Sequence, residues 1–252
     1  MDKFHFLKNE LNKIANNGES FLGFDGGNIN SKIWFCGVEF GSSIEIMNNY
    51  YTDFVKFYKS KNFKIPYRVD CPDYFLKSNF DRFLSFMYLN LFSNCNDRNQ
   101  ISNVLKNNLY NKNSNLFKLN LFPLAKKDIG WDKNITDTFK IEKDDYYNFF
   151  FKNRSRFVKH LISNYRPDCI ICFSPKDYEK YFTEFFIKPK EKVDYSWDKI
   201  KLENSEFKIS KFESKQIKIV IVPFLGRGNI NSFKKVELLT DYLKNNVLQQ
   251  LV

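Results

Sequence analysis

A single acid follows a run of apolar residues near the start of the chain. Ile33 to Val38 read IWFCGV, and Glu39 comes next, between Gly37 and Gly41. Glycine has no Cβ atom and lets the backbone approach a ligand closely. A carboxylate held there can take a proton from water and stabilise a neighbouring positive charge. A Glu39 that activates a water molecule is therefore one interpretation, and a helix cap or a surface acid is the other.

Two further segments carry polar side chains where an apolar run ends. Asn120 lies in FKLNLFPL, just before Pro123, and its amide offers a donor and an acceptor in one plane. A turn-capping role explains Asn120 equally well. Arg227 and Asn229 follow the last apolar run, IKIVIVPF, and could donate hydrogen bonds to an oxygen that gains negative charge.

Periodicity predicts the elements that position these residues. Apolar runs predict buried strands over 32–39, 117–124, 168–174 and 217–224, and a further strand over 207–213. Helical spacing predicts helices over 3–16, 46–58, 78–92, 144–164 and 232–248. We therefore expect an α/β fold, a three-layer domain whose central, mostly parallel four-stranded sheet is flanked by helices. Ligands bind at the carboxyl ends of such strands, where Glu39, Asn120 and Arg227 would converge.

The chain reads as one domain of 252 residues, without internal repeats or a separable linker. Residues 1–30 are expected to be an N-terminal helical extension, and residues 187–206 a charged loop insertion. No window approaches the roughly 18 apolar residues that span a bilayer, and the first residues lack the apolar core of a signal peptide. An odd number of cysteines, five, favours reduced thiols and a cytoplasmic location. Cys169 and Cys172 form a C-x-x-C inside a predicted strand, so we expect no metal and no cofactor.

Forty Lys and Arg against 29 Asp and Glu give a net charge of +11. Such a charge favours polyanions: nucleic acid first, an anionic membrane surface as the competing partner. A basic protein with neither partner is the third possibility. The predicted exposed face of the helix over 144–164 carries Lys152, Arg154, Arg156 and Lys159. Lys234 and Lys235 open the last helix beside the expected cleft, and that place favours contact with DNA phosphates.

Several familiar catalytic motifs are absent. The sequence has no G-x-G-x-x-G, no Walker P-loop and no G-x-S-x-G. His5 and His160 fall in separate predicted helices with no matching nucleophile. Triad hydrolysis is therefore not indicated.

The order of the motifs resembles that of the uracil-DNA glycosylase superfamily over residues 30–245. The first motif of that family closes strand one as Gly-x-(Asp, Asn, Glu or Ala)-Pro-(Gly or Tyr), and GVEFG fits with Glu39 in third place. The second strand of the family carries a base-reading Asn, and its single-strand-selective uracil glycosylases place Pro-Leu shortly after, as in NLFPL. This chain departs from the family in two places. Phe40 replaces the proline, and Val222 occupies the histidine position of the last motif.

The resemblance implies a DNA glycosylase that hydrolyses the N-glycosidic bond of uracil or another modified base. The target nucleotide would be flipped out of the stack. Glu39 would be catalytic, Asn120 and Phe40 would bind the base, and Arg227 or Asn229 would stabilise the leaving base. The expected partner is single- or double-stranded DNA, not a membrane, and the protein is expected to be a monomer without a cofactor. The alternatives are a catalytically silent nucleic-acid-binding protein on the same fold, a nucleoside or nucleotide hydrolase, and a methyltransferase.

Overall fold

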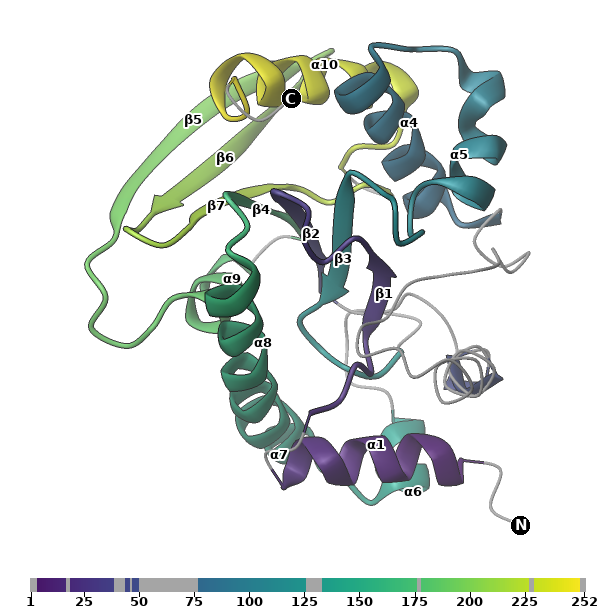
Figure 1. Cartoon of the computed structure of the whole chain (residues 1–252), viewed down its shortest axis with the longest axis vertical. Coiled ribbons are helices and arrows are strands. Elements are labelled where there is room, and N and C mark those ends of the chain that lie inside the picture. Colours follow the sequence, from purple (N-terminus) through teal and green to yellow (C-terminus); the bar gives the residue numbers. More distant parts are fainter. Residues whose placement is uncertain are drawn as a thin grey trace.

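A seven-stranded mixed sheet forms the centre of the molecule (Figure 1). The computed structural model describes residues 4–16, 19–38, 44–45, 47–49, 77–125, 133–175, 178–226 and 229–249. The strands are β1 (Phe24–Gly27), β2 (Ile33–Gly37), β3 (Leu116–Asn120), β4 (Cys169–Ser174), β5 (Asp194–Leu202), β6 (Ser205–Glu213) and β7 (Lys218–Pro223). Their order across the sheet is β1-β3-β2-β4-β7-β6-β5.

The expectation of a four-stranded, mostly parallel sheet is wrong. β2 pairs in parallel with β3 and β4, and β4 with β7, but β1 runs antiparallel to β3, and β6 antiparallel to both β7 and β5. The four runs of buried apolar residues form β3, β2, β4 and β7, which lie side by side. Both edges of the sheet consist of strands without such a run, and these make the sheet larger and mixed.

Two segments differ from their expected structure. Residues 1–30, expected to be a helical extension, contain β1 as well as the helix α1 (His5–Ala15). Residues 187–206, expected to be a loop, contain β5, which pairs with β6 over nine residues. β1 is short and glycine-rich, whereas β5 is largely exposed and charged. Neither strand shows the buried apolar pattern by which strands are recognised.

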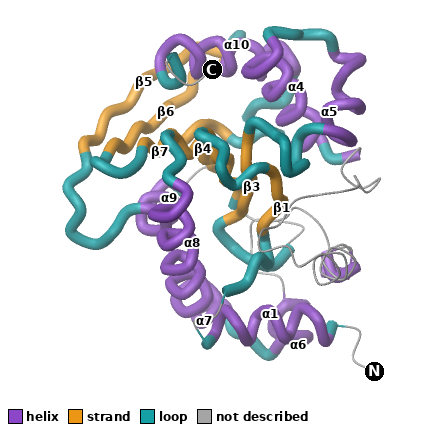
Figure 2. Tube along the Cα trace, in the orientation of Figure 1, coloured by secondary structure: helices purple, strands orange, loops and turns teal. Residues whose placement is uncertain are grey.

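Helices cover both faces of the sheet, which is why its central strands are apolar on both sides. Figure 1 shows α4 (Asn79–Ser93), α5 (Ile101–Asn107) and α10 (Phe233–Asn246) on one side, and α8 (Phe151–Tyr165) and α9 (Glu179–Phe186) on the other. Shorter helices are η1 (Arg98–Gln100), α6 (Lys133–Phe139), α7 (Lys143–Asp145) and η2 (Tyr146–Phe150). Figure 2 shows the helices in purple and the strands in orange.

The helices expected over 3–16, 78–92, 144–164 and 232–248 are confirmed, with α7, η2 and α8 together covering the third range. In the range 46–58, residues 47–49 are helical, and the other residues of this range lie outside the described residues. Within the described residues, no helix combines the length and the hydrophobicity that crossing a bilayer requires.

Candidate functional site

The carboxyl ends of β2 and β3 meet at one point of the sheet. Gly37 pairs with Asn120 there. The two chains stay together for two more residues, because the Leu121 N–H donates to the Gly37 carbonyl at 3.0 Å and the Phe122 N–H to the Val38 carbonyl at 2.9 Å. Glu39 and Phe40 follow Val38 in the sequence and lie outside the described residues, as does Arg227. Asn120, Asn229, Lys234 and Lys235 can be placed.

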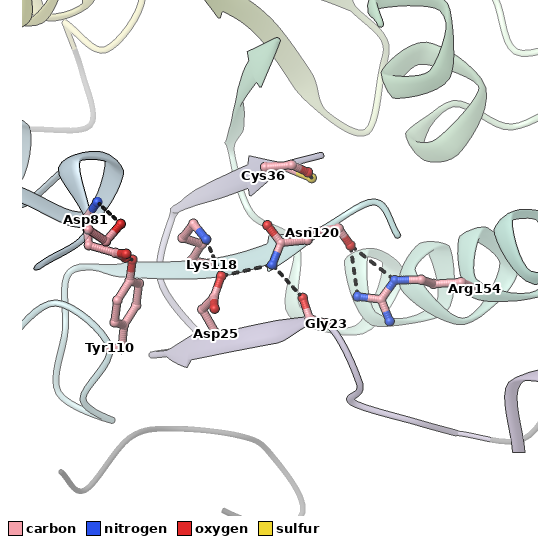
Figure 3. Close-up of polar contacts among 10 residues, drawn as sticks. Gly23, Asp25, Cys36, Asp81, Tyr110, Lys118, Asn120 and Arg154 are labelled. Carbon is pink, nitrogen blue, oxygen red and sulfur yellow. Dashed lines mark hydrogen bonds and ion pairs between the residues drawn. The ribbon is translucent and has the colours of Figure 1, made fainter. Parts of the chain in front are cut away.

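The side-chain amide of Asn120 is buried and held in one orientation (Figure 3). Its Nδ2 donates to the Gly23 carbonyl and to Asp25 Oδ2, both at 3.0 Å. An amide nitrogen carries two hydrogens, so both are used. Its Oδ1 is buried and has no hydrogen-bond partner among the described residues. Buried polar atoms are normally paired, which makes this oxygen a candidate acceptor for a ligand.

Asp25 and Lys118 form a buried ion pair beside Asn120. The register of β1 shifts between Phe24 and Gly26, and this bulge lies at Asp25. Bulges redirect side chains, and here the carboxylate reaches Lys118 and Asn120. The Lys118 ammonium also lies 4.9 Å from the centroid of the Phe80 ring. A buried charge requires such partners, so this pair fixes the carboxylate that orients the Asn120 amide.

Arg154 fixes the main chain of Asn120. Its Nε and Nη2 donate to the Asn120 carbonyl at 3.1 and 2.9 Å, and its Nη1 donates to the Leu22 carbonyl. The guanidinium lies 4.6 Å from the centroid of the Phe24 ring. The prediction that Arg154 shares an exposed basic face is therefore wrong, since only 1% of this residue is exposed.

Gly37 leaves room for the Asn120 side chain. A Cβ atom at Gly37 would lie 2.5 Å from Asn120 Oδ1, a separation that forces one of the two groups to move. Gly37 therefore serves an internal contact. We call Gly23, Asp25, Gly37, Lys118, Asn120 and Arg154 the Asn120 cluster.

A basic groove runs between α8 and α9, with a volume of about 840 Å³. Its cationic lining residues are Lys152, Arg156, Lys159, Lys188 and Lys190, and Glu184 and Glu191 lie among them. Its aromatic lining residues contact Phe122, two residues beyond Asn120, with centroid distances of 4.8 Å for Tyr147, 5.6 Å for Phe151 and 6.1 Å for Tyr181. The groove therefore begins next to the carboxyl end of β3.

Lys159 is the most enclosed cation of this groove. Its ammonium donates to the Glu184 carbonyl at 3.0 Å. Burial lowers the pKa of Lys159 from its ordinary value, although the nearby Glu191 acts in the opposite direction. A lysine that has lost part of its hydration interacts more strongly with an incoming phosphate than a fully solvated one does.

The residues after β7 are held locally. The Asn229 N–H donates to the Gly226 carbonyl at 3.3 Å. The Lys234 ammonium donates to Glu237 at 2.9 Å, and that of Lys235 to Asn231 at 3.3 Å. Among the described residues, none of these hydrogen bonds reaches Asn120.

The first turn of α10 uses an amide that could otherwise bind a phosphate. Ser232 caps this helix, and its hydroxyl accepts a hydrogen bond from the Lys235 N–H at 3.1 Å.

Val222, near the end of β7, is buried and offers no polar group. Phe224 connects this end of the sheet to the Asn120 cluster, because its ring stacks at 5.5 Å on Phe80, which contacts Lys118.

Cys169 and Cys172 are free, buried thiols within β4. Burial raises the pKa of Cys169 to about 12 and that of Cys172 well above its ordinary value. Both thiols therefore stay protonated at neutral pH, and a protonated thiol is a poor nucleophile and metal ligand. No group of three His, Cys, Asp or Glu residues suited to a metal ion occurs among the described residues.

Asp25 and Lys118 were not predicted as part of a site. Asp25 precedes two glycines, Gly26 and Gly27, which both have positive φ values, 106° and 110°. An Asp-Gly-Gly sequence is typical of a bulge or tight turn. Lys118 interrupts the apolar run LFKL, and a lysine there needs a buried partner.

No family model, curated protein or solved structure matches this chain.

Proposed function

We propose that this protein is a DNA glycosylase that hydrolyses the N-glycosidic bond of uracil or another modified base. The observation that carries the proposal is the Asn120 amide, which hydrogen bonds hold at the shared carboxyl end of β2 and β3. Its buried oxygen has no partner within the described part of the chain. Glu39 follows Gly37 by two residues in the sequence. An acceptor for a base edge and a carboxylate for water would thus belong to neighbouring strand ends.

The hydrogen bonds of Asn120 limit what it can recognise. Both amide hydrogens are donated to Gly23 and Asp25, so the side chain offers an acceptor and no donor. The Asn120 side-chain oxygen would accept a hydrogen bond from a ring N–H of the base. In uracil this group is the imide N–H, which lies between two carbonyl groups. Cytosine has an unprotonated ring nitrogen at this position. Two acceptors facing each other in a buried site would be strongly disfavoured, which is how hydrogen-bonding sites discriminate.

The reaction requires little beyond these groups. The nucleotide leaves the stack so that its glycosidic bond becomes accessible. Glu39 takes a proton from water, whose oxygen bonds to the sugar carbon as the bond to the base nitrogen breaks. The base leaves with the electron pair of that bond and is then protonated. Arg227 and Asn229 are the proposed donors to the base oxygen that gains negative charge.

The basic groove gives a place for the DNA backbone. Lys152, Arg156 and Lys159 lie on one stripe of α8 beside the aromatic residues that pack on Phe122. Phosphate contacts position a protein on DNA without reading its sequence. The net charge of +11 supports the same kind of partner.

A catalytically silent nucleic-acid-binding protein is the second candidate. The observation that favours it is the buried, apolar Val222 near the end of β7, where the resemblance calls for a histidine. Loss of one preorganised donor typically costs about 10²–10³ in rate. The Asn120 oxygen is also enclosed, so a base reaches it only when the atoms that cover it move aside.

Base release from matched oligonucleotides tests the proposal. Single strands carrying uracil, N3-methyluracil or cytosine would be incubated with the protein, and alkali would reveal abasic sites. We expect release of uracil and none of N3-methyluracil, since the methyl group replaces the hydrogen that Asn120 accepts. An Asn120→Ala variant should lose this preference. Absence of abasic sites from every oligonucleotide, with binding intact, would favour the silent binder. Equal release of uracil and N3-methyluracil would contradict the role of Asn120.

A further inference from the structure

The hairpin of β5 and β6 presents one sheet face on which two large aromatic side chains are exposed. β5 is an edge strand paired with β6 along nine residues, whereas β6 pairs with β7 only over Ser210–Glu213. The rest of the hairpin therefore extends beyond the sheet, as Figure 1 shows. One of its faces packs against α10, where Tyr242 donates a hydrogen bond to Asp198.

The other face carries two exposed aromatic residues and several lysines. Side chains alternate between the two faces of a strand, which places Tyr195, Trp197, Lys199 and Lys201 on the face opposite Asp198. Tyr195 is 50% and Trp197 55% exposed. From β6, the Lys208 ammonium lies 5.5 Å from the centroid of the Tyr195 ring. We call these five residues the Tyr195–Trp197 face.

Such exposure is unusual for large aromatic side chains, and neighbouring exposed apolar groups commonly mark an interaction site. Tyr195 is kept in place by the Phe212 ring, 4.9 Å away across the strand pair. Residues two apart on a strand are separated by about 7 Å, so the two rings can each receive one base of an extended strand. Rings on a sheet surface beside lysines are a common way of binding single-stranded nucleic acid.

The lysines of this face remain available to phosphates. Lys199 pairs with Glu206 at 2.5 Å, and Lys208 with Glu179 at 3.2 Å. All four side chains are substantially exposed, and exposed ion pairs contribute little to stability. A phosphate can therefore replace a carboxylate at small cost.

We propose that the Tyr195–Trp197 face binds single-stranded nucleic acid, with bases stacked on Tyr195 and Trp197 and phosphates held by Lys199 and Lys201. This interaction goes beyond the proposed excision and does not depend on it. It is measured without any chemical step, so failure of one proposal leaves the other untouched.

Fluorescence anisotropy with labelled oligothymidine and oligouridine of about 15 nucleotides tests the stacking. Trp197→Ala should weaken binding roughly 5- to 150-fold, the loss expected for one stacked base. The matched control is Phe149→Ala, which removes another exposed aromatic side chain, 47% exposed, and should leave affinity within about twofold. Equal affinities of wild type and Trp197→Ala would overturn the proposal.

The salt dependence tests the lysines. The double variant Lys199→Gln, Lys201→Gln should reduce the slope of log K against log salt by roughly 1.4, or 0.7 for each phosphate lost. The control with the same charge change is the double variant Lys106→Gln, Lys112→Gln. It removes two exposed lysines, one in α5 and one after it, and should leave the slope unaltered.

Sedimentation of the same proteins tests whether a second copy of the chain binds this face instead. Self-association that Trp197→Ala abolishes, with nucleic-acid affinity unchanged, would contradict the proposal.

Discussion

Asn120 owes its position to residues that are distant in the sequence. Its side chain is oriented by Gly23 and Asp25, and its carbonyl by Arg154. Asn120 could be predicted at a strand end because an apolar run stops there. Its hydrogen bonds could not, because they depend on an antiparallel strand that the apolar pattern does not reveal. An amide expected to offer both donor and acceptor therefore offers only the acceptor.

Replacing Gly37 by alanine tests the close approach of Gly37 to Asn120. The new Cβ would lie 2.5 Å from Asn120 Oδ1, and overpacking of this kind costs about 1–3 kcal/mol. Urea denaturation should show this loss. The double variant Gly37→Ala, Asn120→Ala should be less unstable than the two single changes added together, since alanine at 120 removes the clashing atom. Strict additivity would contradict the account.

Arg154 and Arg156 provide a matched pair of substitutions two residues apart on α8. Arg154→Lys should destabilise the protein by about 2–4 kcal/mol, because the single nitrogen of lysine cannot reproduce the three hydrogen bonds that the planar guanidinium makes to the Asn120 and Leu22 carbonyls. Arg156→Lys, on the exposed side, should stay within about 0.5 kcal/mol of wild type. Equal thermal stabilities of the two variants would show that the Arg154 guanidinium does not fix this strand end.

The edge strands β1 and β5 were not predicted from the sequence. Strands β2, β3, β4 and β7 are apolar on both faces, a pattern that parallel, doubly covered strands share. β5 alternates aromatic, polar and charged side chains with mostly exposed positions, so its residues read as a charged loop. Its strand structure comes from pairing with β6 and from contact with α10, both of which are tertiary.

Asp198 links β5 to β6 and α10, and its ionisation makes the stability of the hairpin depend on pH. Hydrogen bonds from the Lys211 ammonium, at 2.5 Å, and from the Tyr242 hydroxyl lower the pKa of Asp198. Because the folded pKa lies below the unfolded value of about 3.9, the stabilisation is complete above that value. It is lost as the pH falls through the lowered folded pKa.

The corresponding prediction concerns Asp198→Asn. At pH 7 this variant should lose about 0.5 kcal/mol, an amount discounted because the side chain is 42% exposed. The loss corresponds to a Tm shift on the order of 1–2 °C. The difference from wild type should shrink as the pH is lowered below about 4. Asp194→Asn, on the same face of β5, is the control and should not differ. A difference from wild type that is constant from pH 7 to pH 3 would refute the role of Asp198.

At the scale of the whole molecule, two surfaces of different chemistry lie on one basic protein. The Asn120 cluster and the basic groove meet at the carboxyl end of β3, while the Tyr195–Trp197 face lies on the edge hairpin. Net charge favours a polyanionic partner, and helical spacing predicted that Lys152, Arg156 and Lys159 share one face of a helix. The basic groove depends on the packing of α8 against α9, and the Tyr195–Trp197 face on the pairing of β5 with β6. Local sequence patterns encode neither contact.

We propose that this fold excises a base, with Glu39 as the group that activates water. The most direct measurement is the single-turnover rate of base release from uracil-containing single-stranded DNA, by wild type and by Glu39→Gln, with DNA affinity measured on the same samples. We predict abasic sites with wild type and a rate about 10²–10⁴ lower for the variant, at unchanged affinity. Equal rates for the two proteins, or no base release by wild type while DNA still binds, would contradict the account.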